Sequence, residues 1–595
     1  MCGLAGIIWK SAQQDRGATE RHLAAFEPGL VHRGPDERGV HVGNGFGVVH
    51  RRLSIIDIAT GQQPMMAEGG TVGIAYNGEI YNHQSLRKEL ETRGHHFETH
   101  CDTEVVLRLF IEQGPDSFNR LDGMFALVIW DLRGATPVYH LARDHLGTKP
   151  MYIYEDDKRI CFSSEIRPLL AIPDADLSID PSGLQSFLTF RYTQAPHTLY
   201  RRIARLEAGA RIRIERGLAV RHRYWDIPSR DRPLDIAAPE ARARLHDLLK
   251  QSVSDQQMSE VPVGLLLSGG LDSSVIAYLC GELGVRLKSF NIGFPSINEF
   301  TYSSEVAKAF SLDHLNVETT VEAIIDRFET AIEAMDEPIA DPACFPLHIL
   351  CDEISRHVTV VLSGEGSDEM LGGYPQYRQV FDNGPLPSAE QFDRFLRQSW
   401  YFLDKPPVLS QPFDAARRLR HASYFLERPP LEGMLAYDLK TWLPENLMMK
   451  ADKILMSHSL EGRFPFLSKA IAEFLMALPD DMKLGVEGGK RLLREAFGKR
   501  LPQRIIDRPK MGFSVPLDEL VAAQRDRGYD LLNQHASSEL AACLDIAEVR
   551  RRFDAHHSGE TKNSLWAWTT LALLQWMSAA GRAGAKTPTL PAAAA

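Results

Sequence analysis

The stretch LLLSGGLDSSVIAYL, residues 265–279, constrains the fold of this chain more than any other. An apolar run leads into a glycine-rich turn, and the turn leads into an apolar helical pattern, which predicts strand, loop and helix in that order. Paired glycines let backbone N–H groups converge, and the helix adds its positive N-terminal end. The stretch therefore predicts a phosphate or pyrophosphate site, although it lacks the lysine signature of the common P-loop. The alternative is a tight turn in an ordinary α/β unit.

Two further apolar runs, residues 289–294 and 358–362, alternate with helical patterns in the second half. This alternation predicts a parallel sheet with helices on both faces, in which ligands bind beyond the carboxyl ends of the strands. Polar loops at 268–274, 291–295 and 363–369 should therefore share one edge. That edge brings together Asp272 and Asp368, which offer the hard oxygen ligands that suit Mg²⁺ shared with phosphates. The alternative for the last loop, SGEGSDE, is an acidic segment that caps a helix.

Residues 1 to about 226 show many short strand patterns and few helices, which predicts a layered α+β domain. We expect helices at 84–93, 102–113 and 181–190, and strands at 4–9, 45–50, 71–76, 125–131, 138–143, 151–155 and 160–163, with a last pair within 199–225. The polar, proline-containing residues 228–235 predict a linker, and a helix begins near residue 238.

Length and composition limit the classes of protein that remain. A chain of 595 residues should hold more than one domain. Its formal net charge of -11 gives no electrostatic reason to expect nucleic acid. No window predicts a membrane span, and MCGLAGIIWK does not resemble a signal peptide. The seven scattered cysteines, never in C-x-x-C spacing, favour a reducing compartment, so we expect a cytoplasmic protein.

Cys2 is chemically unusual because of its position. Met1 precedes a small residue, so we expect its removal, which leaves Cys2 with a free α-amino group. A model α-amine has a pKa of roughly 7.7–8.0 and a free thiol one of about 8.5. The residue therefore carries both a nucleophile and its base. The alternative is that the cysteine at position 2 has no chemical role. The motifs that surround it decide between these two interpretations.

Six motifs surround Cys2 in the first half of the chain: MCGLAGI, HRGPD, RRLSIID, YNGEIYNH, the DTE step at residue 102 and LDGMFAL. In this order they resemble the class II glutamine amidotransferases, an N-terminal-nucleophile family, over residues 1–170. The resemblance implies that Cys2 attacks the glutamine amide. It also implies an oxyanion hole made by the Asn77 side-chain amide and the Gly78 backbone N–H.

Glutamine recognition follows from the same resemblance. Arg52 can grip the α-carboxylate of glutamine in bidentate fashion, which Lys could not do as well. Glu79 and Asp102 can hold its α-ammonium group. The alternatives are a surface cation for Arg52 and a helix cap for Asp102, which can serve both roles. The segments RDHLG (143–147) and SSE (163–165) also match and are interpreted as scaffold.

The second half resembles the ATP-pyrophosphatase domain of the glutamine-hydrolysing asparagine synthetases over about residues 255–520. The matching motifs are SGGLDSS, SGEGSDE followed by GGY, LPENLMMKADKILMSHSLEGRFPFL (443–467), GGKRLLRE (488–495) and RPKMGFSVP (508–516). The resemblance implies that Lys490 neutralises phosphate charge and that Glu365 assists formation and breakdown of an acyl-adenylate. It assigns the pyrophosphate and Mg²⁺ to Ser268, Gly269, Gly270, Asp272 and Ser273, a second metal-ligand role to Asp368, and the adenine and ribose to Leu266, Ile292, Ser363 and Gly364. The alternative for Lys490 is one more cation in a basic helix.

Three parts of the chain depart from this family. The segment DEPIADP, residues 336–342, is close to the acceptor-side segment but not identical to its commonest forms. Ser468 stands where the family usually has Asp, which is either a neutral exchange of helix caps or the mark of another acceptor. After about residue 520 the match weakens: residues 566–577 predict an amphipathic or buried helix, and 584–595 a disordered tail.

Together these patterns predict an αββα-layered N-terminal-nucleophile hydrolase domain (1–226), a linker (227–237), an α/β parallel-sheet ATP-pyrophosphatase domain (238–583) and the tail. The resemblance implies asparagine synthesis from L-aspartate, L-glutamine and MgATP, through a glutamyl thioester, ammonia carried in a dry internal passage, and aspartyl-AMP. The alternatives are amidation of another carboxylate in polysaccharide or secondary-metabolite synthesis, and a silent regulator that binds glutamine or nucleotide. The expected partners are small molecules, without nucleic acid or membrane, and a homodimer is the assembly to test.

Overall fold

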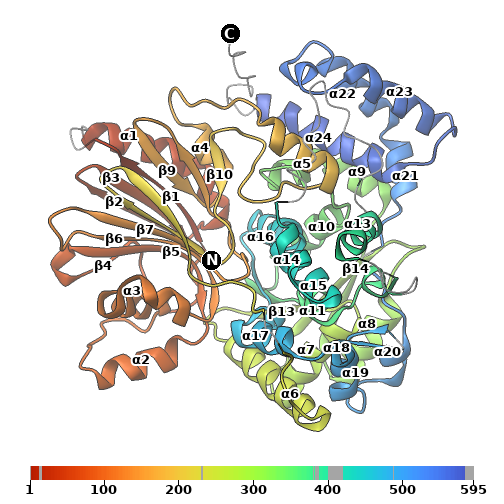
Figure 1. Cartoon of the computed structure of the whole chain (residues 1–595), viewed down its shortest axis with the longest axis horizontal. Helices are drawn as coiled ribbons and strands as arrows, with labels where there is room; N and C mark the ends of the chain where they lie inside the picture. The colour runs from red at the N-terminus through yellow and green to blue at the C-terminus, as the bar shows by residue number, and fades with distance from the viewer. Residues whose placement is uncertain are drawn as a thin grey trace.

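The computed structural model describes residues 2–11, 16–229, 232–379, 381, 387–399, 402, 420–486, 488–512 and 514–582. The predicted tail, 584–595, lies outside the described residues, as do two residues of the predicted linker. In the described part, a half made of two antiparallel sheets lies beside a half built on a parallel sheet (Figure 1).

The first half contains two six-stranded sheets. One has the order β10-β8-β9-β1-β3-β2 and the other β12-β11-β7-β6-β5-β4. The strands are β1 (Cys2–Trp9), β2 (Glu37–Gly43), β3 (Phe46–Arg52), β4 (Met65–Ala67), β5 (Val72–Ile80), β6 (Gly123–Asp131), β7 (Val138–Arg143), β8 (Tyr152–Glu155), β9 (Arg159–Ser163), β10 (Ile203–Arg205), β11 (Ala210–Glu215) and β12 (Leu218–Arg223). The helices are α1 (Arg16–Phe26), α2 (His83–Thr92), α3 (Asp102–Gln113), α4 (Ile166–Leu170) and α5 (Pro181–Phe190).

Strand β1 is buried along its whole length because each of its faces meets a different layer. Ala5 and Ile7 share a core with Leu23 and Phe26 of α1. Leu4 instead packs with strand residues of the other sheet. That other sheet is covered on its far side by α2 and α3. The period-two alternation of apolar side chains therefore produces the predicted αββα layering.

The second half contains a five-stranded parallel sheet of order β15-β14-β13-β16-β17. Its strands are β13 (Val263–Leu266), β14 (Lys288–Gly293), β15 (Asp313–Glu318), β16 (Val360–Leu362) and β17 (Glu461–Arg463). One face packs on α6 (Ala238–Asp255) and α7 (Leu271–Glu282), the other on α9 (Val321–Ala334), α10 (Cys344–Ile354) and α16 (Met448–Met456). The predicted parallel sheet with helices on both faces is therefore confirmed.

Other helices surround this sheet. They are α8 (Phe300–Ala309), α11 (Ser367–Leu371), α12 (Pro375–Gln379), α13 (Ser388–Gln398), α14 (Ala422–Leu426), α15 (Pro430–Lys440), α17 (Lys469–Ala477), α18 (Asp480–Lys483), α19 (Arg491–Phe497) and α20 (Gln503–Asp507), with a short hairpin of β18 (Leu484–Gly485) and β19 (Gly488–Gly489). The chain then forms α21 (Leu517–Ala523), α22 (Arg525–His535), α23 (Ile546–His557) and α24 (Ser564–Arg582). Helices α21 and α24 pack against α9, and α22 and α23 pack against α24. Helix α24 is the predicted buried helix. No helix in the described ranges has the length and apolar character that crossing a membrane requires.

Residues 199–225 hold three strands, β10 to β12, where a pair was expected, and the short β18–β19 hairpin was not predicted. Elsewhere in the three larger sheets, the sequence patterns located the central strands but missed four others. These are β2, β4, β15 and β17. Each lies at the edge of its sheet. Strands β2, β4 and β15 are partly exposed, so their sequences alternate less clearly between apolar and polar residues. Strand β17 is buried, but its three residues, EGR, are not an apolar run. Strand β15, DHLNVE, shows this directly, because none of its residues is fully buried.

Candidate active sites

The first candidate site lies at the start of β1. Antiparallel pairing places Cys2 opposite Arg52 on β3. The Cys2 backbone nitrogen donates to Asn77 Oδ1 on β5 at 3.0 Å, so the two sheets meet at this residue. Three residues predicted from separate motifs therefore converge on one point.

Asn77 keeps a donor free beside Cys2. Its side chain is fully buried, and its Nδ2 has no partner among the described residues, while its Oδ1 is occupied by Cys2. A buried donor without an acceptor is costly unless a ligand supplies the acceptor. The next residue, Gly78, packs so closely on β6 that a Cβ would lie 2.0 Å from the Met124 carbonyl oxygen.

The groups around Cys2 favour neutral side chains. Burial raises the pKa of the Cys2 thiol, opposed by a hydrogen bond with the Leu53 backbone and by the charge of Arg52. Burial also raises the pKa of Glu79 well above its usual value, and the nearby Glu461 carboxylate adds to this rise. The thiol therefore needs a base. The Arg463 guanidinium group, 3.6 Å from Glu79, only partly opposes the rise in the Glu79 pKa, so Glu79 needs a further cation to ionise fully.

Asp102 lies in this site, but the helix-cap interpretation is wrong. Cys101 occupies the cap position of α3, and Asp102 is the first helical residue. Its Oδ2 instead accepts hydrogen bonds from the Ile80 backbone N–H at 2.8 Å and from the Tyr76 hydroxyl at 2.9 Å. These bonds orient the carboxylate toward β5, the strand that carries Glu79.

Arg52 is buried, so the surface-cation alternative is also wrong. Its Nη1 donates to Glu37 Oε2 at 3.0 Å, and its remaining Nη hydrogens are directed at backbone carbonyls. Those acceptors are Ile56, Asp57 and Ile58. A bidentate grip on a substrate carboxylate therefore requires that Glu37 or a carbonyl first be displaced.

The second candidate site lies at the carboxyl end of the parallel sheet. A cavity of about 330 Å³, here called the inner cavity, is lined by seven of the nine residues assigned to ATP and by both Glu365 and Asp368. The seven are Leu266, Ser268, Asp272, Ser273, Ile292, Ser363 and Gly364. They lie at or just beyond the carboxyl ends of β13, β14 and β16, as expected when parallel strands end at one edge.

A second cavity of about 760 Å³, the outer cavity, adjoins the first and shares five lining residues with it, among them Ser268 and Asp272. Gly270 and Lys490 line this outer cavity. Gly269 lies in neither lining; its φ of +71 and its close approach to the Ser303 backbone nitrogen leave no room for a side chain. The loop thus turns as predicted.

The Lys490 side chain links the two predicted metal carboxylates. Its Nζ lies 2.6 Å from Asp272 Oδ2 and 2.6 Å from Asp368 Oδ1. Lys510 contacts the other oxygen of Asp368 at 2.7 Å. Burial alone would raise the pKa of Asp368, but the two ammonium groups lower it to about 2. Alternating charges therefore face each other where the two cavities meet.

Lys490 is not a cation within a basic helix. It precedes α19 with a φ of +60, and its side chain is almost fully buried. Gly373 makes room for this arrangement, because a Cβ there would lie 1.9 Å from Asp368 Oδ1 and 2.3 Å from Lys490 Cε. The acidic-cap alternative for SGEGSDE also fails, since Asp368 pairs with two lysines.

At the other end of the inner cavity, charged groups surround Glu365. Lys450 Nζ lies 3.0 Å from Asp341 Oδ2, and both residues line the cavity. Burial raises the pKa of Glu365, and the charges of Lys450 and Lys510 oppose that rise. Asp341, Lys450 and Lys510 lie in segments that match or nearly match the family motifs, but the motifs assign these residues no role. Only their convergence on one cavity draws attention to them.

The carboxylates of this site suit a shared Mg²⁺ ion. Asp272 and Asp368 direct one oxygen each at a common point, now taken by the Lys490 ammonium group. Within the described residues, no group of three or more His, Cys, Asp or Glu could hold a metal by itself. Two carboxylates with open positions fit Mg²⁺, which is usually held partly by substrate phosphates and water.

A buried network of ions joins the two halves, and no motif in the sequence indicated it. Arg33 Nη1 contacts Glu165 at 2.6 Å and Asp452 at 2.8 Å. The other pairs across the interface are Lys149–Asp452, Arg143–Glu445, Arg205–Glu445, Arg205–Glu337, Lys453–Glu165 and Arg463–Glu79. The RDHLG and SSE segments, interpreted as scaffold, thus supply interface ions.

Ser468 belongs to the same interface and not to the inner cavity. Its hydroxyl donates to Asp122 Oδ2 at 2.8 Å, and the backbone nitrogen of Lys469 bonds the other oxygen of Asp122 at 3.0 Å. Ser468 occupies the cap position of α17 without a capping side-chain bond. This departure from the family pattern is therefore not among the residues that line the inner cavity.

Comparisons with known proteins agree with this geometry. A family model described as asparagine synthase matches residues 244–578, and one described as a glutamine amidotransferase domain matches residues 1–225. Asparagine synthetase (glutamine-hydrolyzing) 1 of Bacillus subtilis is 30% identical over 620 residues, covering 97% of this chain and 96% of the relative. Asparagine synthetase (glutamine-hydrolyzing) 3 of Bacillus subtilis is 30% identical over 536 residues, covering 86% of this chain and 86% of the relative. Escherichia coli asparagine synthetase B (glutamine-hydrolyzing) is 28% identical over 534 residues, 86% of this chain and 82% of the relative.

Proposed function

Because the chain belongs to the asparagine synthase family and is an ATP-dependent, glutamine-hydrolysing amide ligase, we propose that its acceptor is L-aspartate. The reaction converts L-aspartate, L-glutamine, ATP and water to L-asparagine, L-glutamate, AMP and diphosphate. Its intermediates are a glutamyl thioester, ammonia and aspartyl-AMP. We keep residues 1–226 and 238–583 as the two domains of the proposal.

In the first step the Cys2 thiol attacks the glutamine amide. Removal of Met1 turns the Cys2 nitrogen into an amine, which the bond to Asn77 Oδ1 orients. Since burial keeps the thiol protonated, this amine takes its proton. The Asn77 Nδ2 and the Gly78 N–H then stabilise the oxyanion, and each donor is worth about 3 kcal/mol of barrier.

Substrate charges complete the glutamine site. The glutamine carboxylate replaces Glu37 at the Arg52 guanidinium, since Glu37 now occupies the place that a carboxylate ligand would take. The ammonium group binds between Glu79 and Asp102, and its charge lets Glu79 ionise. The Cys2 ammonium group gives its proton to the amide nitrogen, ammonia leaves the tetrahedral intermediate, and water then releases glutamate from the thioester.

In the second site the inner cavity takes the nucleoside and α-phosphate. The SGGLDSS turn directs its N–H groups at the phosphates, and Lys490 moves from the carboxylates to the departing diphosphate. When bound, Mg²⁺ would be held by Asp272 and Asp368 and would neutralise phosphate charge. The outer cavity, with its basic lining, accommodates the diphosphate.

The single observation that carries the choice of acceptor is the Asp341–Lys450 pair in the inner cavity. An amino-acid acceptor brings an α-ammonium and an α-carboxylate group, and this pair offers one partner of opposite charge to each. Glu365 lies on the same wall, next to the carboxylate that attacks the α-phosphate. A simple dicarboxylate would leave Asp341 facing a like charge.

Ammonia is proposed to pass between the sites inside the interface. Glu79 Oε1 of the first site lies 3.6 Å from Arg463 on β17. The Arg463 carbonyl oxygen accepts a hydrogen bond from the Ser363 N–H, at 2.9 Å, in the lining of the inner cavity. One residue therefore touches both sites, which supports a short internal route.

The test of the acceptor is diphosphate release from ATP against a panel of acids, with ammonium as nitrogen source. Aspartate should stimulate release, whereas succinate and N-acetylaspartate should not, because each lacks the ammonium group. If another acid stimulates release while aspartate does not, the proposed acceptor is wrong. Asp341→Asn should raise KM for aspartate and leave KM for ATP unchanged, with the exposed Asp313→Asn on β15 as control.

A further inference from the structure

Asp336 and Glu337, which precede Asp341 in the chain, form a turn with an unusual backbone. Asp336 has a φ of +62, a left-handed conformation that residues other than glycine rarely adopt. Asp336 and Glu337 are also almost fully buried. Such a conformation persists only where the surroundings hold it from several sides.

The first half of the chain holds the Asp336 carboxylate. Backbone N–H groups of Ile166 and Arg167 at the start of α4 donate to its two oxygens, the latter at 3.0 Å. Lys453 on α16 adds an ammonium contact to Oδ2 at 3.3 Å. The carboxylate therefore acts as an anchor between α4 and the parallel-sheet half.

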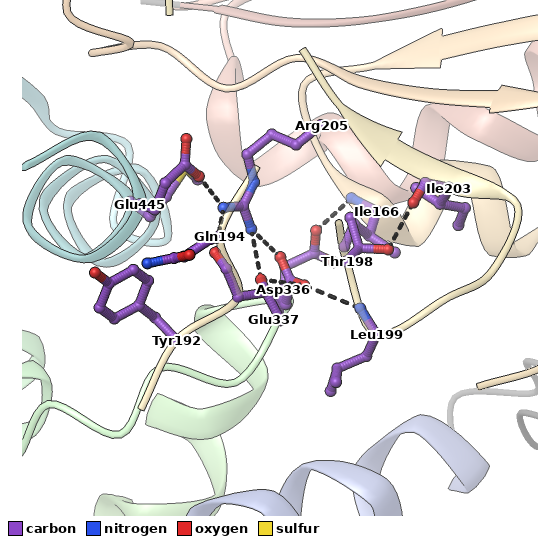
Figure 2. Close-up of polar contacts among 12 residues, drawn as sticks. Ile166, Tyr192, Gln194, Thr198, Leu199, Ile203, Arg205, Asp336, Glu337 and Glu445 are labelled. Carbon is purple, nitrogen blue, oxygen red and sulfur yellow. Dashed lines mark hydrogen bonds and ion pairs between the residues drawn. The ribbon is translucent and has the colours of Figure 1, made fainter. Parts of the chain in front are cut away.

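The loop that follows α5 holds Glu337. Its Oε1 accepts hydrogen bonds from the Thr193 hydroxyl at 2.8 Å and the Leu199 N–H at 3.2 Å. Its Oε2 pairs with Arg205, and the same guanidinium group pairs with Glu445 (Figure 2). These ions have almost no exposure to solvent.

The C-terminal region supplies a third contact. The indole N–H of Trp576 on α24 donates to the Asp336 carbonyl oxygen at 3.1 Å. This is a role for the part of the chain that matched the family patterns least well. The turn at Asp336 thus joins the first half, the parallel-sheet half and the C-terminal helices.

From this turn the chain runs directly into the inner cavity. The Ala340 N–H donates to the Arg191 carbonyl oxygen at 3.0 Å, which is again a contact to the first half. The next residue is Asp341, which pairs with Lys450. Asn446 also contacts Asp341 Oδ2, at 3.3 Å, and lies beside Glu445, so both ends of the network reach the acceptor wall.

We propose that the Asp336–Glu337 turn is a positioning element for the acceptor site, set by Arg205 from the first half and by Trp576 from α24. Its contacts place Asp341 against Lys450 in the geometry that the acceptor requires. The inference rests on the proposed role of Asp341 in acceptor binding. A buried ion network alone is weak evidence for stability, which leaves positioning as its stronger use.

The test uses the full-length protein with Glu337→Gln and Trp576→Phe. The first keeps the size of the side chain and removes its charge opposite Arg205, and the second removes one N–H donor. The matched control is Trp568→Phe on the same helix, because the Trp568 indole N–H has no partner among the described residues. Kinetics use whichever acid the panel identifies, with ammonium as nitrogen source.

We expect Glu337→Gln to raise KM for the acceptor at least fivefold, a size typical of coupling between distant groups, with kcat changed less than about twofold. Trp576→Phe should raise it about twofold to tenfold, the range for one hydrogen bond, and Trp568→Phe should leave it unchanged. Glutaminase activity and KM for ATP should stay constant. If all activities and the thermal midpoint fall together, the turn is only structural and the proposal fails.

Amide hydrogen exchange of residues 339–345 separates this proposal from the proposed function. Faster exchange there in both variants, but not in Trp568→Phe, supports the positioning role whatever the acceptor is. Unchanged exchange overturns it. Faster exchange with an unchanged KM would instead show that Asp341 does not bind the acceptor, which contradicts the proposed function.

Discussion

The two candidate sites solve the problem of buried charge in opposite ways. Around Cys2, burial favours the neutral forms, because it raises the pKa of the thiol and of Glu79. The guanidinium group of Arg52 already donates to Glu37 and to backbone carbonyls. At the end of the parallel sheet, charge is kept and paired: Asp272, Lys490, Asp368 and Lys510 alternate along one wall.

The difference follows from the substrates that each site is proposed to bind. Glutamine carries its own ammonium and carboxylate groups, so it can ionise one partner and replace another as it enters. ATP brings several negative charges, which require cations already in place. The first site is therefore expected to respond to pH through substrate binding, and the second to respond to the loss of any one charge.

The largest effect should come from the first site. Cys2→Ala should lower glutamine hydrolysis by at least about 10⁴-fold, as expected for loss of a nucleophile. Synthesis from added ammonium should continue, because Cys2 lies in the other half. Glutamate release and amide formation are measured separately in the same preparation. Parallel loss of both activities in a folded protein would remove the distinction between the two sites.

Asp272→Asn should have the opposite effect to Cys2→Ala, because it alters the second site and leaves the first intact. Diphosphate formation should fall about 10²-fold to 10³-fold, because Lys490 loses one of its two counter-charges and the phosphates lose a metal ligand. Basal glutaminase activity should be unchanged. The control is Asp313→Asn, an exposed carboxylate on the same sheet. A similar fall in the control would point to general damage to the sheet.

The pH dependence of glutamine binding should sharpen the contrast. Because Glu79 has a raised pKa in the free protein, it is protonated at pH values where its proposed partner, the glutamine ammonium, needs a carboxylate. KM for glutamine should therefore fall as pH rises, by up to about tenfold per pH unit below that pKa, and level off above it. Glu79→Gln should give a high KM that changes little with pH. A wild-type KM that rises with pH would contradict this account.

The smallest effect concerns the free energy of unfolding, which we expect Asp438 to make dependent on pH. Burial raises the pKa of Asp438 to about 7, even though the Tyr377 hydroxyl bonds it at 2.5 Å. A raised pKa means that the folded state holds a proton which the unfolded chain releases, so stability is lost as pH rises from about 4 to 7. Asp438→Asn should remove this loss of stability. It should therefore raise the thermal midpoint at pH 8, by about 2–4 °C for each kcal/mol regained, and leave the midpoint at pH 4 unchanged. A gain that is equal at both pH values would show that ionisation is not the cause.

Much of both sites could be predicted from short motifs because their geometry is local. The strand, the SGGLDSS turn and α7 are consecutive in the chain, so apolar periodicity and paired glycines suffice to predict a phosphate loop. Cys2 is recognisable by its position and by the motifs around it. Parallel topology adds one long-range conclusion, that Asp272 and Asp368 share an edge, since strands of one direction end on one side.

Other features had no local signal. The cap expected of Asp102 is wrong because its carboxylate bonds β5, a strand more than twenty residues earlier in the sequence, and no pattern around residue 102 indicates that contact. Edge strands such as β15 are short and polar, so their periodicity is weak. Lys450 and Lys510 belong to quoted motifs, yet their roles depend on which cavity they enter.

The sequence by itself predicted the two chemistries: a thiol at residue 2 that is expected to lie beside its own amine, and a glycine-rich turn after a buried strand. Both depend on residues that are neighbours in the chain or repeat with the period of a strand or helix. The tertiary structure alone decided how the two are joined. Arg205 and Trp576, which are far apart in the sequence, both contact the Asp336–Glu337 turn. Burial makes each of those charges and donors depend on its partner, and only the folded chain brings the partners together.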